Sequence, residues 1–137
     1  MDGLYELAMR PIMRIEGAAL RGEVSWASLP AAQQEEMDEA AAMLTEAGAQ
    51  GHARAHYALG NLLKHVWNDI DGAEAAYRAA IAADRGHAKA HVNLGLLLQD
   101  ERKDFDGAEA AYRAAIAADP GYTKAHSNLR KLLEAGT

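Results

Sequence analysis

Apolar residues recur at helical spacing along most of the chain, and short polar stretches separate the helical segments. Residues 53–65 place one stripe on a single helix face, formed by Ala55, Leu59, Leu62 and Leu63. Residues 70–83 carry a second stripe, formed by Ile70, Ala73, Ala76, Tyr77, Ala80 and Ile81. Asp69 and Asp104 are suited to N-cap positions, while Gly86 and Pro120-Gly121 follow a helix where it must end. This pattern predicts a unit of helix, turn, helix and turn.

The unit is repeated along the chain. The segment DGAEAAYRAAIAAD occurs unchanged at Asp71–Asp84 and at Asp106–Asp119, so the two copies are 35 residues apart. Extended in both directions, Ala53–His87 and Ala88–Tyr122 agree at 23 of 35 positions. A third copy then begins, and it repeats the same stripe as Ala125, His126, Leu129, Leu132 and Leu133. A fixed period of this size is typical of stacked repeat proteins.

The repeat resembles the tetratricopeptide repeat (TPR) family. The resemblance rests on Leu59-Gly60, Leu94-Gly95, Ala73, Ala108, Tyr77, Tyr112, Ala80, Ala115 and Asp119-Pro120. Three features depart from the family: the period is 35 where 34 is usual, a histidine (His56, His91, His126) replaces an aromatic residue, and Arg130 replaces the glycine. Sel1-like repeats are the nearest alternative. The resemblance implies an all-α fold, a right-handed TPR-like α-solenoid of about seven helices, that acts as a protein-interaction scaffold.

The first fifty residues fit this scheme less closely. A helical stripe runs from about residue 2 to residue 20, and Pro11 either kinks this helix or begins it. Residues 21–29 form a predicted loop, and Ser28 is a candidate cap for a helix from Pro30 to about Gly48. Residues 1–50 are therefore a degenerate repeat or an unrelated helical cap. Repeats at 53–87 and 88–122 and a capping helix at 123–137 complete the predicted organisation.

Composition narrows the classes of function. The chain has 137 residues, a net charge of −6 and no cysteine, which argues against general nucleic-acid binding and thiol chemistry. No basic segment precedes an apolar run at the N-terminus, and no stretch has 18 apolar residues. We expect a cytoplasmic protein with no membrane partner. Motifs of nucleophilic or phosphate chemistry are missing, so we expect no enzyme activity and no cofactor.

In the TPR family the first helices of successive repeats line a concave groove that binds peptides. The residues outside the apolar stripe of these helices form the predicted peptide-binding groove: Arg54, Tyr57, Asn61, Lys64, Lys89, Val92, Asn93, Leu96, Lys124, Asn128 and Lys131. Arg54, Lys89 and Lys124 recur at the repeat spacing, which favours an acidic peptide or a free C-terminal carboxylate as the ligand. The competing interpretation is that a repeat simply copies its surface charges and that the chain self-associates as a structural element.

Two more specific hypotheses, a carboxylate clamp and a zinc site, have less support from the sequence. The carboxylate clamp by which some TPR domains grip chaperone C-termini is matched at Asn61, Asn93 and Lys124, but Tyr57 and Asn128 stand where basic residues are expected. The segments HARAH (52–56) and HAKAH (87–91) have the spacing of a zinc-binding pair. Each lies at the start of its predicted helix, however, and neither has the glutamate of the HExxH motif, so we expect no metal site.

Trp26 and Trp67 are either partner anchors or plugs at a repeat edge.

Overall fold

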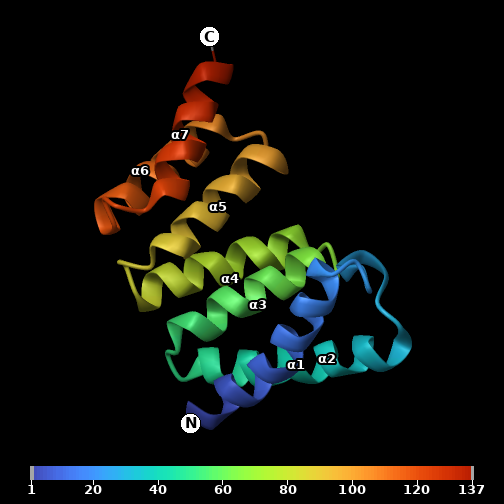
Figure 1. Cartoon of the computed structure of the whole chain (residues 1–137). Coiled ribbons are helices and arrows are strands. Elements are labelled where there is room, and N and C mark those ends of the chain that lie inside the picture. Colours follow the sequence, from blue (N-terminus) through green and yellow to red (C-terminus); the bar gives the residue numbers. More distant parts are fainter. Residues whose placement is uncertain (1, 137) are drawn as a thin grey trace. The chain divides into compact units, whose positions relative to one another are not determined.

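A computed structural model describes residues 2–136, which form seven α-helices and one short 3₁₀ helix (Figure 1). The elements are α1 (Asp2–Leu20), η1 (Trp26–Ser28), α2 (Ala31–Ala49), α3 (Ala53–His65), α4 (Ile70–Ala83), α5 (Ala88–Asp100), α6 (Phe105–Ala118) and α7 (Thr123–Ala135). No strand occurs within these described residues. The prediction of an all-α fold with about seven helices is confirmed, and α3 and α4 span the residues whose periodicity predicted them.

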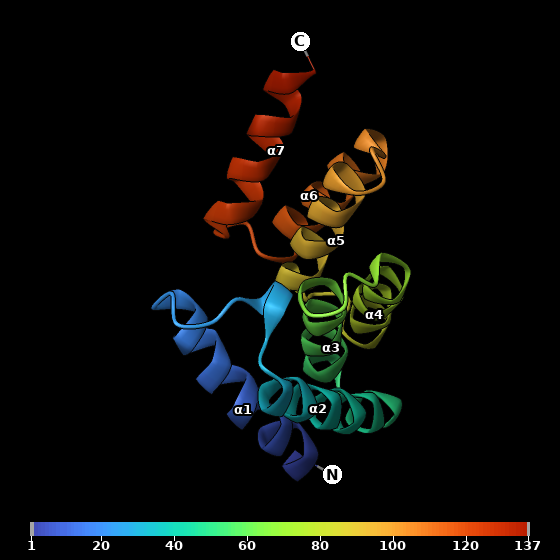
Figure 2. The same ribbon diagram turned by 90° about the vertical axis from the view of Figure 1, so that its right-hand side faces the viewer.

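The chain divides into two compact units, residues 1–76 and 77–137, and the boundary lies within α4. The first unit is built on α1, α2 and α3, where α1 packs on α2 and α2 packs on α3 (Figure 2). Its core consists of Ala8, Ile12, Ile15, Met37, Ala40, Leu44, Ala47, Ala55, Ala58 and Leu62. Trp26 and Trp67 are half-buried and pack against this core.

The helices of the first unit approach closely where a glycine permits it. A Cβ atom added at Gly48 of α2 would lie 2.7 Å from the ring of His56 on α3. The ring therefore packs directly on the backbone of α2, as expected for a histidine that replaces a packing aromatic residue. Nearby, the ring of Tyr5 on α1 stacks on that of His52, with 4.6 Å between ring centroids.

Two details of the N-terminal region differ from expectation. Helix α1 runs through Pro11 without ending, so the alternative that Pro11 begins the helix is wrong. The proposed cap Ser28 is also wrong: Pro30 precedes α2 with no side-chain cap, and Ser28 lies inside η1. The serine that does cap a helix is Ser25, whose hydroxyl accepts a hydrogen bond from the amide of Ala27 at 3.3 Å.

In the second unit α5 packs on α6, and α6 packs on α7. The closest approach joins Gly95 of α5 to Tyr112 of α6, because a Cβ atom at Gly95 would lie 2.6 Å from the tyrosine ring. Tyr112 is fully buried, and its hydroxyl donates to Oε1 of Gln99 at 2.7 Å. The small residue and the large ring thus set the spacing of this helix pair.

The turn inside each repeat uses one arrangement twice. Asp69 and Asp104 accept hydrogen bonds from the amides of Gly72 and Gly107, each at 2.9 Å, which confirms their predicted capping role. The preceding Asn68 and Lys103 have φ values of 50° and 57°, in the left-handed region. Four residues separate the helices in each copy, and one of them takes this left-handed conformation.

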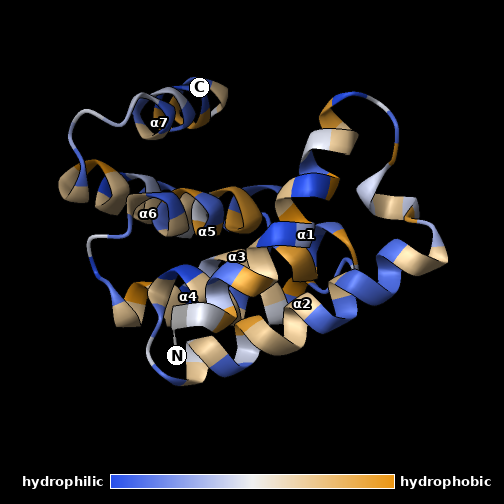
Figure 3. Cartoon of the chain, turned by 60° about the horizontal axis from the view of Figure 1, so that its bottom comes forward, coloured by the Kyte–Doolittle hydropathy of each residue, from blue (hydrophilic) through white to orange (hydrophobic). Residues whose placement is uncertain are grey.

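Every helix carries hydrophilic and hydrophobic segments, as the hydropathy colouring of Figure 3 shows. Among the described residues, no helix combines the length and the apolar character that crossing a membrane requires.

We expect Gly95→Ala to lower the free energy of unfolding by about 1–3 kcal/mol, because the added methyl group displaces the Tyr112 ring. This loss opposes the gain of about 1 kcal/mol that alanine normally brings to a helix. Chemical denaturation would measure the change. In a Tyr112→Ala background the same substitution should become neutral or stabilising, and an unchanged cost there would contradict the proposed contact.

Stability should also depend on pH in the alkaline range. Burial, with a smaller contribution from the Asp100 carboxylate, raises the pKa of Tyr112 to about 12. The unfolded chain releases this proton near pH 10, so the stabilisation is complete below pH 10 and is lost as pH rises through 12. Thermal melts between pH 9 and about 12 would show a smaller decline for Tyr112→Phe than for wild type.

Candidate peptide-binding face

The predicted groove residues fall in both units. In the first unit, α3 presents Arg54 to solvent and leaves Tyr57, Asn61 and Lys64 half-buried. In the second unit, Lys89 on α5 and Lys124 and Lys131 on α7 are exposed, while Asn93, Leu96 and Asn128 are half-buried. Ten of the eleven predicted residues therefore have surface that a ligand can reach.

Val92 is the exception. It has no exposed surface and packs with Ala115 of α6 and Ala125 of α7 in a small core. Val92 lies off the main apolar stripe of α5, as its position in the helix predicted, but Ala115 of α6 and Ala125 of α7 cover that side of α5. Val92 therefore supports the face from below and is left out of the ligand contacts.

The same small core positions the charged residues of the second unit. Leu96 of α5 and Tyr122 before α7 pack against its rim as partly buried residues. Lys89 lies one helical turn before Val92, and Lys124 directly precedes Ala125. The rigid cluster thus fixes the two helix segments from which Lys89 and Lys124 reach solvent, with Leu96 as adjacent apolar surface.

Asn128 has an unusual environment. Its Nδ2 atom is buried and has no hydrogen-bond partner within the described residues. A buried donor without an acceptor costs about 1–3 kcal/mol.

The histidine pairs have structural roles. His52 and His87 are the N-caps of α3 and α5, and Nδ1 of each accepts the amide hydrogen of Ala55 or Ala90, at 3.3 and 3.2 Å. Because their backbone is not helical, they do not share a helix face with His56 and His91. No group of three potential metal-ligating side chains occurs in the part of the chain that the structure describes.

Residues 68–123 match the family model of the tetratricopeptide repeat. No curated protein sequence gives a significant match. The crystal structure of MamA superimposes with a TM-score of 0.63 at 27% identity over 72% of this chain, which spans 58% of the MamA chain. The first TPR domain of Spaghetti (RPAP3), bound to the HSP90 peptide SRMEEVD, gives a TM-score of 0.66 at 17% identity and covers 95% of this chain and 93% of its own.

These matches agree with the helix pairs described above. The fold is that of a TPR-like helical solenoid, and the repeated segment at 68–123 is of the tetratricopeptide type.

Capping by His87 can be tested directly. Replacement by alanine should cost about 0.5–2 kcal/mol of unfolding free energy, whereas asparagine, an alternative cap, should retain most of it. A metal chelator should leave the melting temperature of the untagged protein unchanged. If the chelator lowered it, or if both variants lost the same stability, the capping role would be wrong.

Proposed function

We propose that the protein binds an acidic peptide segment, through a face that includes Lys89, Asn93, Leu96, Lys124, Asn128 and Lys131 in the second unit. The observation that carries this proposal is the exposure of Lys89 and Lys124 on helix segments held by one buried cluster. On a chain with a net charge of −6, this local concentration of positive charge favours an anionic partner. The α3 residues Arg54, Tyr57, Asn61 and Lys64 form the corresponding contact set of the first unit.

The chemistry of the face suits a carboxylate ligand. Ammonium groups form charge-assisted hydrogen bonds with carboxylates. The half-buried side chain of Asn93 lies one helical turn after Lys89 on α5. The exposed part of Leu96 adds apolar contact. The peptide in the Spaghetti structure, SRMEEVD, has three acidic residues among its last four, and it therefore serves as a suitable probe.

We expect labelled SRMEEVD to bind in a fluorescence anisotropy titration, with affinity that falls as salt is raised. Reversing two charges with Lys89→Glu/Lys124→Glu should weaken binding at least about tenfold, which corresponds to about 1.4 kcal/mol. The control Arg10→Glu/Arg113→Glu makes the same charge change at two exposed residues outside the face.

Equal weakening by both double variants would show a response to net charge and would overturn the proposed face. Amidation of the peptide separates a terminal carboxylate from an internal acidic segment, because only the former loses affinity. Weaker peptide binding by Arg54→Glu would show that the α3 residues also contact the peptide.

Self-association is the alternative function. One observation favours it: a hollow of about 400 Å³ on α7 is lined by His126, Leu129, Arg130, Leu133 and Glu134 alone, and Leu133 is 44% exposed. Light scattering over a range of concentrations distinguishes the two, since a peptide receptor can remain monomeric and a self-assembling element cannot.

A further inference from the structure

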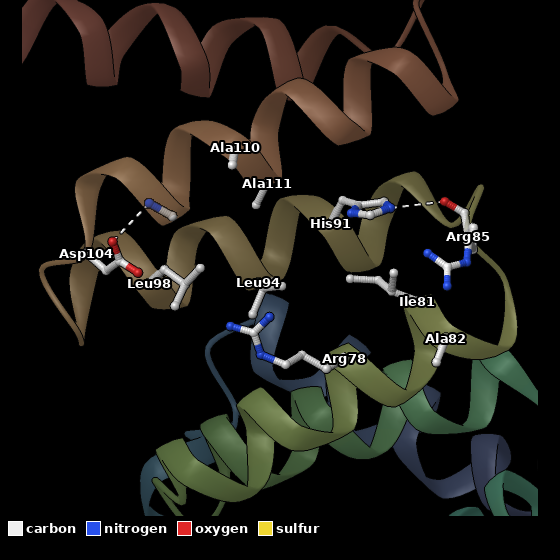
Figure 4. A pocket seen from close by; sticks show the side chains of 11 residues that line it. Arg78, Ile81, Ala82, Arg85, His91, Leu94, Leu98, Asp104, Ala110 and Ala111 are labelled. Atoms are coloured by element: carbon white, nitrogen blue, oxygen red, sulfur yellow. Dashed lines mark hydrogen bonds between the residues drawn. The ribbon is translucent and has the colours of Figure 1, made fainter.

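The second unit contains a hollow that the sequence did not reveal. It has a volume of about 500 Å³ and lies between the C-terminal part of α4 and the pair α5 and α6 (Figure 4). Its apolar floor includes Ile81, Leu94 and Leu98, with small residues of α6 beside them. Arg78 and Arg85 line it from α4 and the turn that follows, and Asp104 lies at the end near Leu98.

Comparison with α2 and α3 shows which residues differ at this place. If Ala40 and Ala47 of α2 are aligned with Ala73 and Ala80 of α4, then Gly48 corresponds to Ile81. Gly48 allows the His56 ring to pack on the helix backbone. At Ile81 a branched side chain takes that volume, and the equivalent His91 instead donates Nε2–H to the carbonyl oxygen of Arg85, at 3.0 Å.

The charges at the hollow are distributed unevenly. The side chains of Arg78 and Arg85 lie at the side formed by α4, and no carboxylate of the described residues lies within ion-pair distance of the Arg85 guanidinium. The carboxylate of Asp104 already accepts the Gly107 amide as the cap of α6. Apolar surface flanked by guanidinium groups matches a ligand that is apolar on one side and anionic beside it.

The dimensions indicate the form of this ligand. Seven residues separate His91 from Leu98, so the floor follows α5 for about 10 Å, or two helical turns. Several lining residues, among them Arg78, Ala82 and Ala110, are exposed, so the hollow is an open groove rather than an enclosed cavity. No strand edge is available in the described residues for β-augmentation, and a groove between helices is a common receptor for an amphipathic helix.

We propose that this groove binds a short acidic amphipathic helix of a partner protein, with aliphatic side chains on Ile81, Leu94 and Leu98 and carboxylates beside Arg78 and Arg85. This site is distinct from the lysine face of α5 and α7. Its ligand needs no free C-terminus.

The probe is an acetylated and amidated peptide with two copies of Glu-Leu-Ala-Glu-Leu-Leu-Glu. Two matched peptides carry serine for every leucine or glutamine for every glutamate. We expect wild type to bind the first peptide and to bind each matched peptide at least about tenfold more weakly. Equal binding of the serine peptide would overturn the apolar part of the proposal, and equal binding of the glutamine peptide would overturn its ionic part.

The internal repeat supplies controls of identical local sequence. Arg78→Glu should weaken binding at least about tenfold, whereas Arg113→Glu, one repeat later and outside the groove, should have no effect. Ala82 is exposed and lines the groove, so Ala82→Trp should block peptide binding. The matched control is Ala117→Trp, at the equivalent exposed position of α6 outside the groove, and it should leave binding unchanged. Circular dichroism melts verify that each variant is folded.

Methyl NMR locates the peptide independently of mutation. Ile81 resonances should shift on titration and Ile116 resonances should not, because Ile116 packs against the Val92 cluster. Lys89→Glu/Lys124→Glu should retain this peptide, which separates the groove from the proposed carboxylate-binding face. Absence of binding by wild type, or equal loss in both members of a control pair, would overturn the proposal.

Discussion

The contact between Gly95 and Tyr112 is the constraint on which the second unit depends. Because the ring lies where a Cβ atom of residue 95 would be, a larger residue at 95 must displace the ring, and a smaller residue at 112 would leave a cavity. The buried hydroxyl also needs Gln99, one turn further along α5, which fixes the rotation of the helix as well as its distance. Alanine-rich surfaces alone would allow α6 to slide along α5. The tyrosine and its two partners select one register.

The turns complete this specification with backbone geometry. Asp104 caps α6 by bonding to Gly107, and a Cβ atom at Gly107 would lie 2.3 Å from the same carboxylate. The glycine three residues after the cap therefore makes room for the capping side chain, although glycine is a poor helix former. This explains why the duplicated segment begins with Asp-Gly inside a helix. Lys103 takes up the left-handed conformation just before the cap, so the chain enters α6 from a fixed direction.

Sequence periodicity predicted the helices well because every helix buries one stripe, and a stripe is a local property. It failed where contacts with another helix, or the conformation of a loop, decide whether a residue caps a helix or is exposed. Ser28 is a good capping residue by type, but the 3₁₀ turn places it inside another element. Val92 lies off the main stripe of α5, yet it meets Ala115 and Ala125 of other helices. The groove beside Ile81 was missed for the same reason: Arg78 and Arg113 have identical neighbours in sequence, and only tertiary structure distinguishes them.

Two segments of identical sequence can thus have different surroundings in this chain. A copied segment carries the same charges and the same apolar residues, but its surroundings decide which of them are available. Arg113 lies on an exposed helix face, whereas Arg78 lines a hollow with an apolar floor. At the position of Gly95, the last copy has Arg130, whose side chain leaves no room for a tyrosine like Tyr112. A repeat protein can therefore acquire one specific site by changing a few contacts around an unchanged segment, because close packing converts a single side chain into a difference in spacing between helices.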